Sequence, residues 1–507
     1  MGSLARNTYY NISAFGINTI LSLVAVTVLV RGYGLDGYGL IILARLLLPS
    51  GVLGLLEAGF PEVTARAVAA GRALGDLTQI SRRVSAASLM AAGIGLSASL
   101  LLWLFTGTIV DLVFHSADSG RAALENLILI SALSLPLQLV GSVLRGAFEG
   151  SERFALVRSV EVLSNLGYLA VVVIMLLAYD TTSIDAALAY VWVWNARSLL
   201  YVGLVLFGGG KEVSFGTRQI WTGNGAFLAH AFQLFSGKFF SMLLNFGPTI
   251  VLGIFSNAAT VGSYEIVMRI PKALKTVSGM FNGALLPFAA RSDALGDRAS
   301  VRRVVEEGTM LVVGLVATLC VTIMIFSTEV LHYWLDITDP ELSLYLQIAL
   351  VWPLLVATIG IGSTMLLSRR AAAAAINRLS MVTTLGYFVL AIGLYPWLTW
   401  RAFVLALIIS QVVTIPAYWR LQAREYEVDI AAWSGFAVRS LLMAAFAFLL
   451  SVGIRFIAPV DGLVMLIMQA LLVAFLMGAG VCLFGAPPDL RRAIGQFWKR
   501  SLGRLRS

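Results

Sequence analysis

The sequence predicts an all-α polytopic membrane protein with about 14 transmembrane helices. Of its 507 residues, 59% are apolar and only 12% are charged, and the mean hydropathy is +0.88. Since a spanning helix needs about 20 apolar residues, this composition has room for roughly 15 of them. It excludes a soluble enzyme, a nucleic-acid-binding domain and a single-span receptor. Continuous apolar runs also disfavour an outer-membrane barrel, whose strands alternate apolar and polar residues.

Long apolar runs alternate with short charged segments along the chain. Each run is long enough to cross the hydrocarbon core of a bilayer. We place the spans at residues 8–30, 37–60, 84–106, 123–147, 156–178, 184–207, 226–253, 259–289, 307–327, 342–368, 374–396, 400–420, 435–457 and 461–484. No connecting segment can hold a soluble domain, so the functional groups must lie within or between the helices.

Basic residues collect in alternate loops. The loops that follow even-numbered spans hold most of the Arg and Lys residues, including Arg82, Arg83, Arg302 and Arg303. The other loops are richer in Asp and Glu. By the positive-inside rule, both termini are expected in the cytoplasm. This distribution also accounts for the net charge of +9 without a nucleic-acid partner.

Four pairs of short motifs recur in the same order. They are Ala73–Asp76 and Ala294–Asp297, Arg82–Val84 and Arg302–Val304, Pro136 and Pro353, and Leu166–Tyr168 and Leu385–Tyr387. Six helices per repeat make the repeats parallel, related by a pseudo-twofold axis along the membrane normal, as in transporters that bind substrate between repeats.

The duplication predicts four segments of the chain. We expect an N-lobe at 1–210, a C-lobe at 211–422, two extra helices at 423–486 and a cytoplasmic tail at 487–507. Basic and apolar residues interleave in the tail, which predicts an amphipathic helix on the inner leaflet. A disordered basic tail is the alternative.

Several motifs then identify a family. Arg31–Gly39, Leu56–Phe60, Gly150–Phe154 and Gly262–Glu265 resemble, in this order, segments of the polysaccharide (O-antigen/exopolysaccharide) flippases. These belong to the multidrug/oligosaccharidyl-lipid/polysaccharide exporter superfamily. The resemblance covers about residues 7–420, and the 14-helix form is also similar to the lipid II flippase. It implies two six-helix lobes in a V, located in the bacterial inner membrane. It also implies translocation of undecaprenyl-diphosphate-linked oligosaccharide to the periplasmic leaflet for cell-surface polysaccharide biosynthesis.

Cations inside the spans are the candidate substrate-binding residues. Ionisable groups within a membrane are costly and usually face a cavity or a partner. Arg45, Lys238, Arg269 and Lys272 could bind a diphosphate, with Lys275 as a further member of the helical stripe. An ion pair or a side chain that reaches the membrane interface is the alternative for Arg45. Structural charges are the alternative for the two lysines of the stripe.

Other polar residues have less specific interpretations. Glu57, Glu161 and Glu265 are candidate coupling acids for H⁺ or Na⁺, although pairing with Arg66 or Arg158 would also explain the first two. A polar lining of helix 1 and two helix hinges are further candidates: Asn7, Asn11, Asn18, Pro49 and Pro271. Four aromatic residues could stack on sugars, yet interfacial aromatic belts explain many such residues: Tyr9, Tyr10, Trp192 and Trp194. Arg197 is a weaker candidate.

We therefore expect an alternating-access flippase, not an enzyme, driven by an ion gradient because no ATP-binding motif is present. No cofactor or metal site is expected. Its partners would be the lipid-linked oligosaccharide, membrane lipids and polysaccharide polymerase machinery. A lipid II flippase or a cation-coupled multidrug exporter is the alternative, although helix 1 lacks the acid expected of the drug type. A membrane polymerase or ligase is disfavoured by the absence of a large loop, and a scaffold by the charged spans.

Overall fold

A computed structural model describes residues 3–57, 59–114, 120–207, 225–279, 298–366, 370–427 and 462–480, with four single residues between 442 and 460. All regular structure in these ranges is helical, and ten helices among them are long and apolar enough to cross a membrane. The all-α polytopic fold class is therefore confirmed. The chain divides into two compact units, Met1–Glu265 and Ile266–Ser507.

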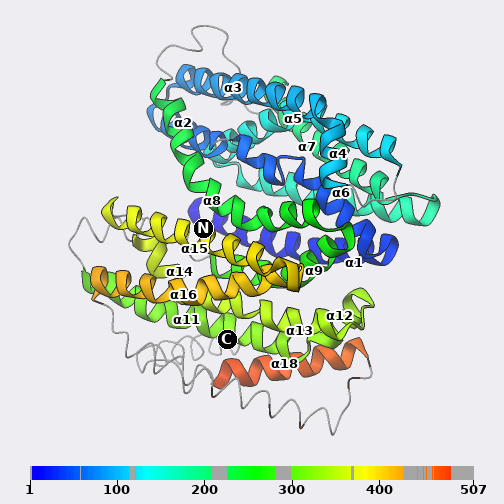
Figure 1. The fold of residues 1–507 in the computed structure, drawn as a ribbon. Coiled ribbons are helices and arrows are strands. Elements are labelled where there is room, and N and C mark those ends of the chain that lie inside the picture. Colours follow the sequence, from blue (N-terminus) through cyan, green and yellow to red (C-terminus); the bar gives the residue numbers. More distant parts are fainter. Residues whose placement is uncertain are drawn as a thin grey trace, which may run out of the picture. The chain divides into compact units, whose positions relative to one another are not determined.

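The first unit holds the N-terminal helices (Figure 1). They are α1 (Ser3–Leu46), the 3₁₀ helix η1 (Val52–Glu57), α2 (Phe60–Leu74), α3 (Leu77–Leu104), α4 (Thr106–Val113), α5 (Arg121–Gly150), α6 (Phe154–Ala178), α7 (Ser183–Leu206), α8 (Gly225–Phe255) and the start of α9 (Ala258–Gly279). The division falls at Glu265, beyond the lobe boundary predicted at residue 210.

The second predicted span, 37–60, is wrong at its C-terminal end. Helix α1 includes the first span, passes through Gly34 with φ +71°, and ends at Leu46. Residues 47–51 form a turn that contains Pro49, followed by η1. Proline lacks a backbone N–H and its ring clashes with the preceding turn, which disfavours a continuous helix here, although α5 and α9 do continue through a proline. The predicted loop after this span also contains a helix that we did not predict, α2.

The second unit continues from the middle of α9. Its other described helices are α11 (Arg298–Ile325), α12 (Ser327–Leu335), α13 (Pro340–Ala349), α14 (Val351–Leu366), α15 (Arg370–Leu398), α16 (Arg401–Tyr426) and α18 (Leu463–Gly480). Helix α18 corresponds to the predicted span 461–484 and packs against α11. The predicted helix 435–457 and the tail 487–507 lie outside the described residues.

The helix order repeats between the units, as the duplicated motifs predict. Helix α11 begins and ends 221 residues after α3. Short α12 follows α11 as short α4 follows α3, and both are capped by a phenylalanine, Phe326 and Phe105. One difference is that α5 runs continuously through Pro136, whereas its counterpart is divided between α13 and α14 just before Pro353.

Glycines bring helix backbones into contact in the first unit. A Cβ added at Gly146 of α5 would lie 2.7 Å from the carbonyl carbon of Pro61 in α2. One added at Gly150 would lie 2.8 Å from the Cα of Ala65. In lipid, helices associate through such close packing at small residues rather than through the hydrophobic effect. This contact holds α2, the helix that follows the break and η1, against α5.

The glycine contact makes a stability prediction. Gly146→Ala should overpack the contact between α2 and α5 and destabilise the protein by about 1–3 kcal/mol, seen as a lower Tm in detergent. The matched control is Gly167→Ala in α6, where a Cβ meets nothing within 4 Å. That change should leave the Tm unchanged or raise it, because Ala favours the helix. Equal Tm values for the two variants would contradict the prediction.

Candidate functional site

Arg45 lies in the last turn of α1, immediately before the break at Pro49. A helix C-terminus carries partial negative charge, which favours a cation there. The turn folds back tightly, since a Cβ at Gly51 would lie 2.6 Å from the Cα of Leu46. The break therefore fixes where the Arg45 side chain leaves the backbone.

The Arg45 guanidinium contacts aromatic rings of α7. Its carbon lies 4.2 Å from the ring centroid of Tyr190, and Nη2 donates a hydrogen bond of 3.1 Å to the Tyr190 hydroxyl. Tyr190 in turn stacks on Trp194 at 4.0 Å and 25°, and the Arg197 guanidinium lies 5.2 Å from the Trp194 ring centroid. We call Arg45, Tyr190, Trp194 and Arg197 the cation–aromatic series. Cation–π contacts of this kind stabilise a desolvated charge by about 2 kcal/mol.

Helical spacing explains why the series forms. Its three α7 members are separated by four and three residues, so they share one face of the helix. Tyr168 of α6 supports the face, with its ring edge-on to Tyr190 at 5.1 Å and 88°. From the sequence, Trp194 and Arg197 were only weak candidates, and the two tyrosines were not predicted. The spacing on one face of α7 was the signal that could have found them.

Buried amides fix α7 behind this face. Gln138 Nε2 donates to Asn195 Oδ1 at 2.9 Å, and Asn195 Nδ2 donates to Ser134 Oγ at 2.7 Å. These bonds join α5 to α7 in an apolar environment, where hydrogen-bonded amides hold helices together. Asn18 joins α1 to α6 by accepting a 2.8 Å bond from Asn165 Nδ2. The side chains of Asn7 and Asn11 lie outside the described residues.

Glu161 and Glu57 lie beside arginines. Arg158 donates to Glu161 at 2.7 Å and to Glu149 at 3.1 Å, and Arg145 lies 3.6 Å from Glu161. Glu57, at the end of η1, is close enough to Arg145 to interact with it electrostatically. Glu161 thus has the Arg158 partner that the alternative interpretation expected. We call Arg145, Glu149, Arg158 and Glu161 the ion-pair cluster of α5 and α6.

Glu265 has a different environment. Its side chain is buried, with 6% of the residue exposed, and Oε1 accepts a 2.6 Å hydrogen bond from Thr249 of α8. Its role as a coupling acid remains a prediction.

The other predicted cations lie outside the first unit or outside the described residues. Arg269 and Lys272 are half-buried on the part of α9 that belongs to the second unit. Lys275 points its ammonium at the buried ring of Trp352, 4.6 Å from the centroid. The side chain of Lys238 lies outside the described residues. Of the four predicted cations, the structure thus describes Arg45 in most detail.

The two candidate hinges differ in position. Pro271 lies inside α9, as predicted, whereas Pro49 lies in the turn between α1 and η1 rather than within a helix. Pro49 therefore lies in a complete break between two helices, rather than at a bend within one helix. In the part of the chain that the structure describes, no three His, Cys, Asp or Glu side chains gather where they could hold a metal ion.

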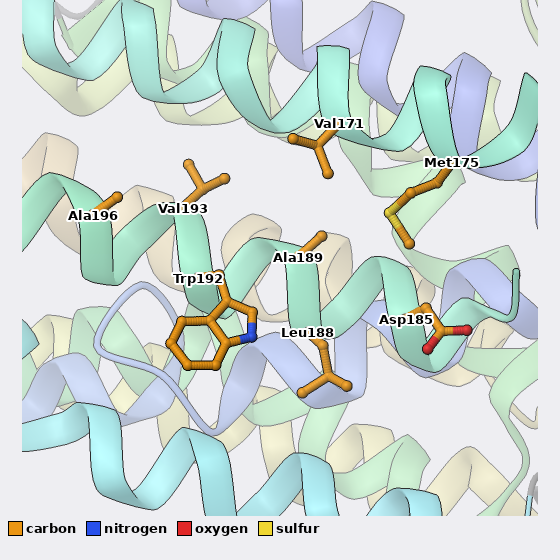
Figure 2. Close-up of a pocket in the computed structure, with 8 residues that line it drawn as sticks. All are labelled: Val171, Met175, Asp185, Leu188, Ala189, Trp192, Val193 and Ala196. Carbon is orange, nitrogen blue, oxygen red and sulfur yellow. The ribbon is translucent and has the colours of Figure 1, made fainter. Parts of the chain in front are cut away.

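The opposite face of α7 is apolar and borders an open groove of about 470 Å³ (Figure 2). Val171 and Met175 of α6 point across the groove toward Ala189 and Val193 of α7, beside Trp192, which is 59% exposed. Since Trp192 lies two residues from each ring of the series, it points away from them. An exposed apolar surface of this kind suits contact with lipid. Helix α7 therefore presents the cation–aromatic series on one face and an apolar surface on the other.

Comparisons with known proteins agree with this architecture. A family model described as polysaccharide biosynthesis protein matches residues 4–292. The fold is similar to that of the lipid II flippase MurJ in an inward closed conformation, with a TM-score of 0.71 and 12% identity over 93% of this chain and 98% of that chain. It is also similar to an inward-facing multidrug resistance MATE family transporter of the MOP superfamily, with a TM-score of 0.64 and 14% identity over 83% of this chain and 98% of that chain. No curated protein sequence matches significantly. The resemblance drawn from the sequence is thereby confirmed, and the structural matches establish the fold.

The ion-pair cluster makes a second stability prediction. Glu161→Gln should destabilise the protein by about 3 kcal/mol, because two partly buried arginines lose a shared carboxylate. In contrast, Glu306→Gln removes a more exposed pair with Arg302 within one helix and should cost less than about 0.5 kcal/mol. Thermal unfolding in detergent compares the two variants. A larger loss of stability in Glu306→Gln would refute the assignment.

Proposed function

Because the chain belongs to the polysaccharide biosynthesis protein family, we propose that it is a flippase for lipid-linked oligosaccharides. It would move undecaprenyl-diphosphate-linked repeat units from the cytoplasmic to the periplasmic leaflet by alternating access. The sugar-diphosphate head would cross inside the protein while the polyprenyl tail stays in lipid. The product would serve cell-surface polysaccharide synthesis, and polysaccharide polymerase machinery is the proposed partner.

The observation that carries the proposal is the environment of Arg45. The bend at Gly34 lies in the predicted loop between the first two spans, and hence near the membrane surface. Arg45 follows eleven positions later, or about 16 Å along the helix, which corresponds to about the middle of a 30 Å hydrocarbon core. Among the described residues, Arg45 contacts neutral rings and no carboxylate pairs with it. A positive charge held in the membrane by neutral groups attracts an anion, and a guanidinium suits a diphosphate because its planar donors bind two oxygens at once.

The remaining polar groups fit the same substrate. The half-buried Trp194, between Tyr190 and Arg197, is proposed to contact the sugars. The cations predicted on other helices, Lys238, Arg269 and Lys272, are proposed to contact the same head group at other stages of transport. These assignments rest on residue type and on position within spans.

We propose that an H⁺ or Na⁺ gradient drives transport. Among the three candidate acids, we propose Glu265 for proton exchange; it is buried and accepts a hydrogen bond from Thr249. Glu57 and Glu161 lie beside arginines, so structural ion pairing is the alternative role for both. The charge distribution supports an inner-membrane location with both termini in the cytoplasm.

A lipid II flippase is the second candidate, because its substrate presents the same diphosphate and the fold supports either cargo. A cation-coupled multidrug exporter is less compatible, since the positive charge of Arg45 would repel a cationic drug. Translocation assays that offer lipid II and an undecaprenyl-diphosphate oligosaccharide in parallel separate the two flippases.

The function makes a prediction about Arg45. In proteoliposomes that contain an undecaprenyl-diphosphate oligosaccharide, Arg45→Ala should lower the translocation rate at least tenfold, because the diphosphate loses its charged partner. Arg45→Lys should retain an intermediate rate, since it keeps the charge but not the bidentate donors.

The control is Arg121→Ala, which removes an exposed arginine paired with Asp111 and Glu125 and should leave the rate within twofold. The Tm of each variant confirms folding. Undiminished transport by a folded Arg45→Ala protein would refute the assignment of Arg45.

A further inference from the structure

The duplicated Leu-Gly-Tyr motif ends in a tyrosine whose surroundings differ between the repeats. In the second unit, Tyr387 of α15 is buried, and its ring lies edge-on to the apolar ring of Phe403 in α16, with the centroids 6.3 Å apart. In the first unit, Tyr168 of α6 lies edge-on to Tyr190 of α7, whose ring also contacts the Arg45 guanidinium. The duplicated tyrosine therefore lies beside the proposed substrate-binding arginine in the first repeat and beside a phenylalanine in the second.

Tyr168 and Arg45 lie at about the same depth in the membrane. A 3.0 Å hydrogen bond between the hydroxyls of Tyr33 and Thr181 joins the bend at Gly34 to the segment just after α6. Arg45 follows the bend by eleven residues, and Tyr168 precedes the end of α6 by ten, which correspond to about 16 and 15 Å of helix. Both residues are therefore near the middle of the hydrocarbon core.

Three helices place phenol groups around Arg45. Helices α1, α6 and α7 pack against one another. Arg45 and Tyr168 both contact Tyr190, and they are close enough to each other to interact electrostatically. Tyr38 precedes Arg45 by seven residues on the same face of α1, and it interacts electrostatically with both Arg45 and Tyr168. The neighbours of the guanidinium thus include O–H groups, which donate hydrogen bonds to anions as N–H groups do.

The Tyr168 hydroxyl has no acceptor in the described part of the chain. Only 5% of the residue is exposed, and the hydroxyl oxygen is buried without a hydrogen-bond partner among the described residues. Such a group is costly in the hydrocarbon core, where water does not compensate for it. An unpartnered hydroxyl alone does not select a ligand, but the neighbouring guanidinium does, because it attracts an anion whose oxygens accept from both groups.

We propose that the Tyr168 hydroxyl donates a hydrogen bond to the same diphosphate that Arg45 binds, which makes Tyr168 a further substrate-binding residue. This inference rests on the proposed function. The bound diphosphate replaces the Tyr190 hydroxyl as the acceptor of Arg45, and it also supplies the acceptor that Tyr168 lacks. Arg45 is half-buried rather than enclosed, so the head group reaches the pair from the side of the guanidinium. Because Tyr387 packs on Phe403, we expect no such role for it.

The test measures binding of undecaprenyl diphosphate to the full-length protein in neutral detergent, from the rise in Tm with lipid concentration. Tyr168→Phe should need at least about fivefold more lipid for half of this rise, because the diphosphate loses a donor. Without lipid, the Tm of this variant should equal or exceed that of the unaltered protein, since a buried hydroxyl without a partner has been removed. Undecaprenol, which has the same tail and no phosphate, should affect both proteins equally.

The matched control is Tyr387→Phe, which removes the hydroxyl of the duplicated tyrosine. It should leave the requirement for undecaprenyl diphosphate within twofold of that of the unaltered protein. Arg45→Ala separates this inference from the proposed function. If Arg45→Ala weakens binding and Tyr168→Phe does not, the inference is wrong while the assignment of Arg45 stands. If neither variant changes binding, or if the unaltered protein does not bind the lipid, both are wrong.

Three further results would overturn the inference about Tyr168. A lower Tm of Tyr168→Phe without lipid, or failure of this variant to fold, would show that the hydroxyl has a structural partner. Equal losses of affinity in Tyr168→Phe and Tyr387→Phe would show that the effect does not depend on the neighbouring arginine. An equal loss of affinity for undecaprenol would assign Tyr168 to the lipid tail instead of the diphosphate.

Discussion

The helix break between Leu46 and Val52 is the constraint on which the polar site of the first unit depends. Helix α1 ends at Leu46, shortly before Pro49, and the chain turns there before η1 begins at Val52. The turn is possible because Gly51 lets it fold closely against the end of α1. It leaves Arg45 at a helix C-terminus, where the partial negative charge favours a cation and the face of α7 is within reach.

The rest of the unit holds α7 in position for this contact. Gln138, Asn195 and Ser134 form a chain of hydrogen bonds between α5 and α7, and glycines allow α2 and α5 to approach at backbone distance. Hydrogen bonds and close glycine contacts hold these helices together in lipid, where hydrophobic burial cannot drive one helix against another. A rigid frame of this kind suits a site in which aromatic rings orient a guanidinium.

The two repeats share an order of helices but differ in the surroundings of their side chains. In the second unit, small polar groups link the helices: Gln422 donates to the Ile359 carbonyl at 3.1 Å, and Thr383 donates to Thr414 at 3.0 Å. Both units also place cations against rings and acids, with Arg45 on Tyr190 and Arg158 on Glu161 in the first, and Arg401 on Trp400 and Glu341 in the second. Duplication thus preserved packing while the surroundings of equivalent residues diverged, since Tyr168 lies against Tyr190 and its counterpart Tyr387 against Phe403.

The sequence alone determined the membrane class, most helix positions and the duplication, and it singled out Arg45 as a candidate. Apolar length and loop charge are local properties, so they can be read without a fold. The tertiary structure decided what surrounds each charge. Tyr190 is 145 residues from Arg45, and no local pattern connects them. Likewise, Glu161 has arginine partners and Glu265 a threonine partner because of how helices pack. Such contacts depend on the rotation of each helix about its axis, which the summed packing of all its neighbours determines.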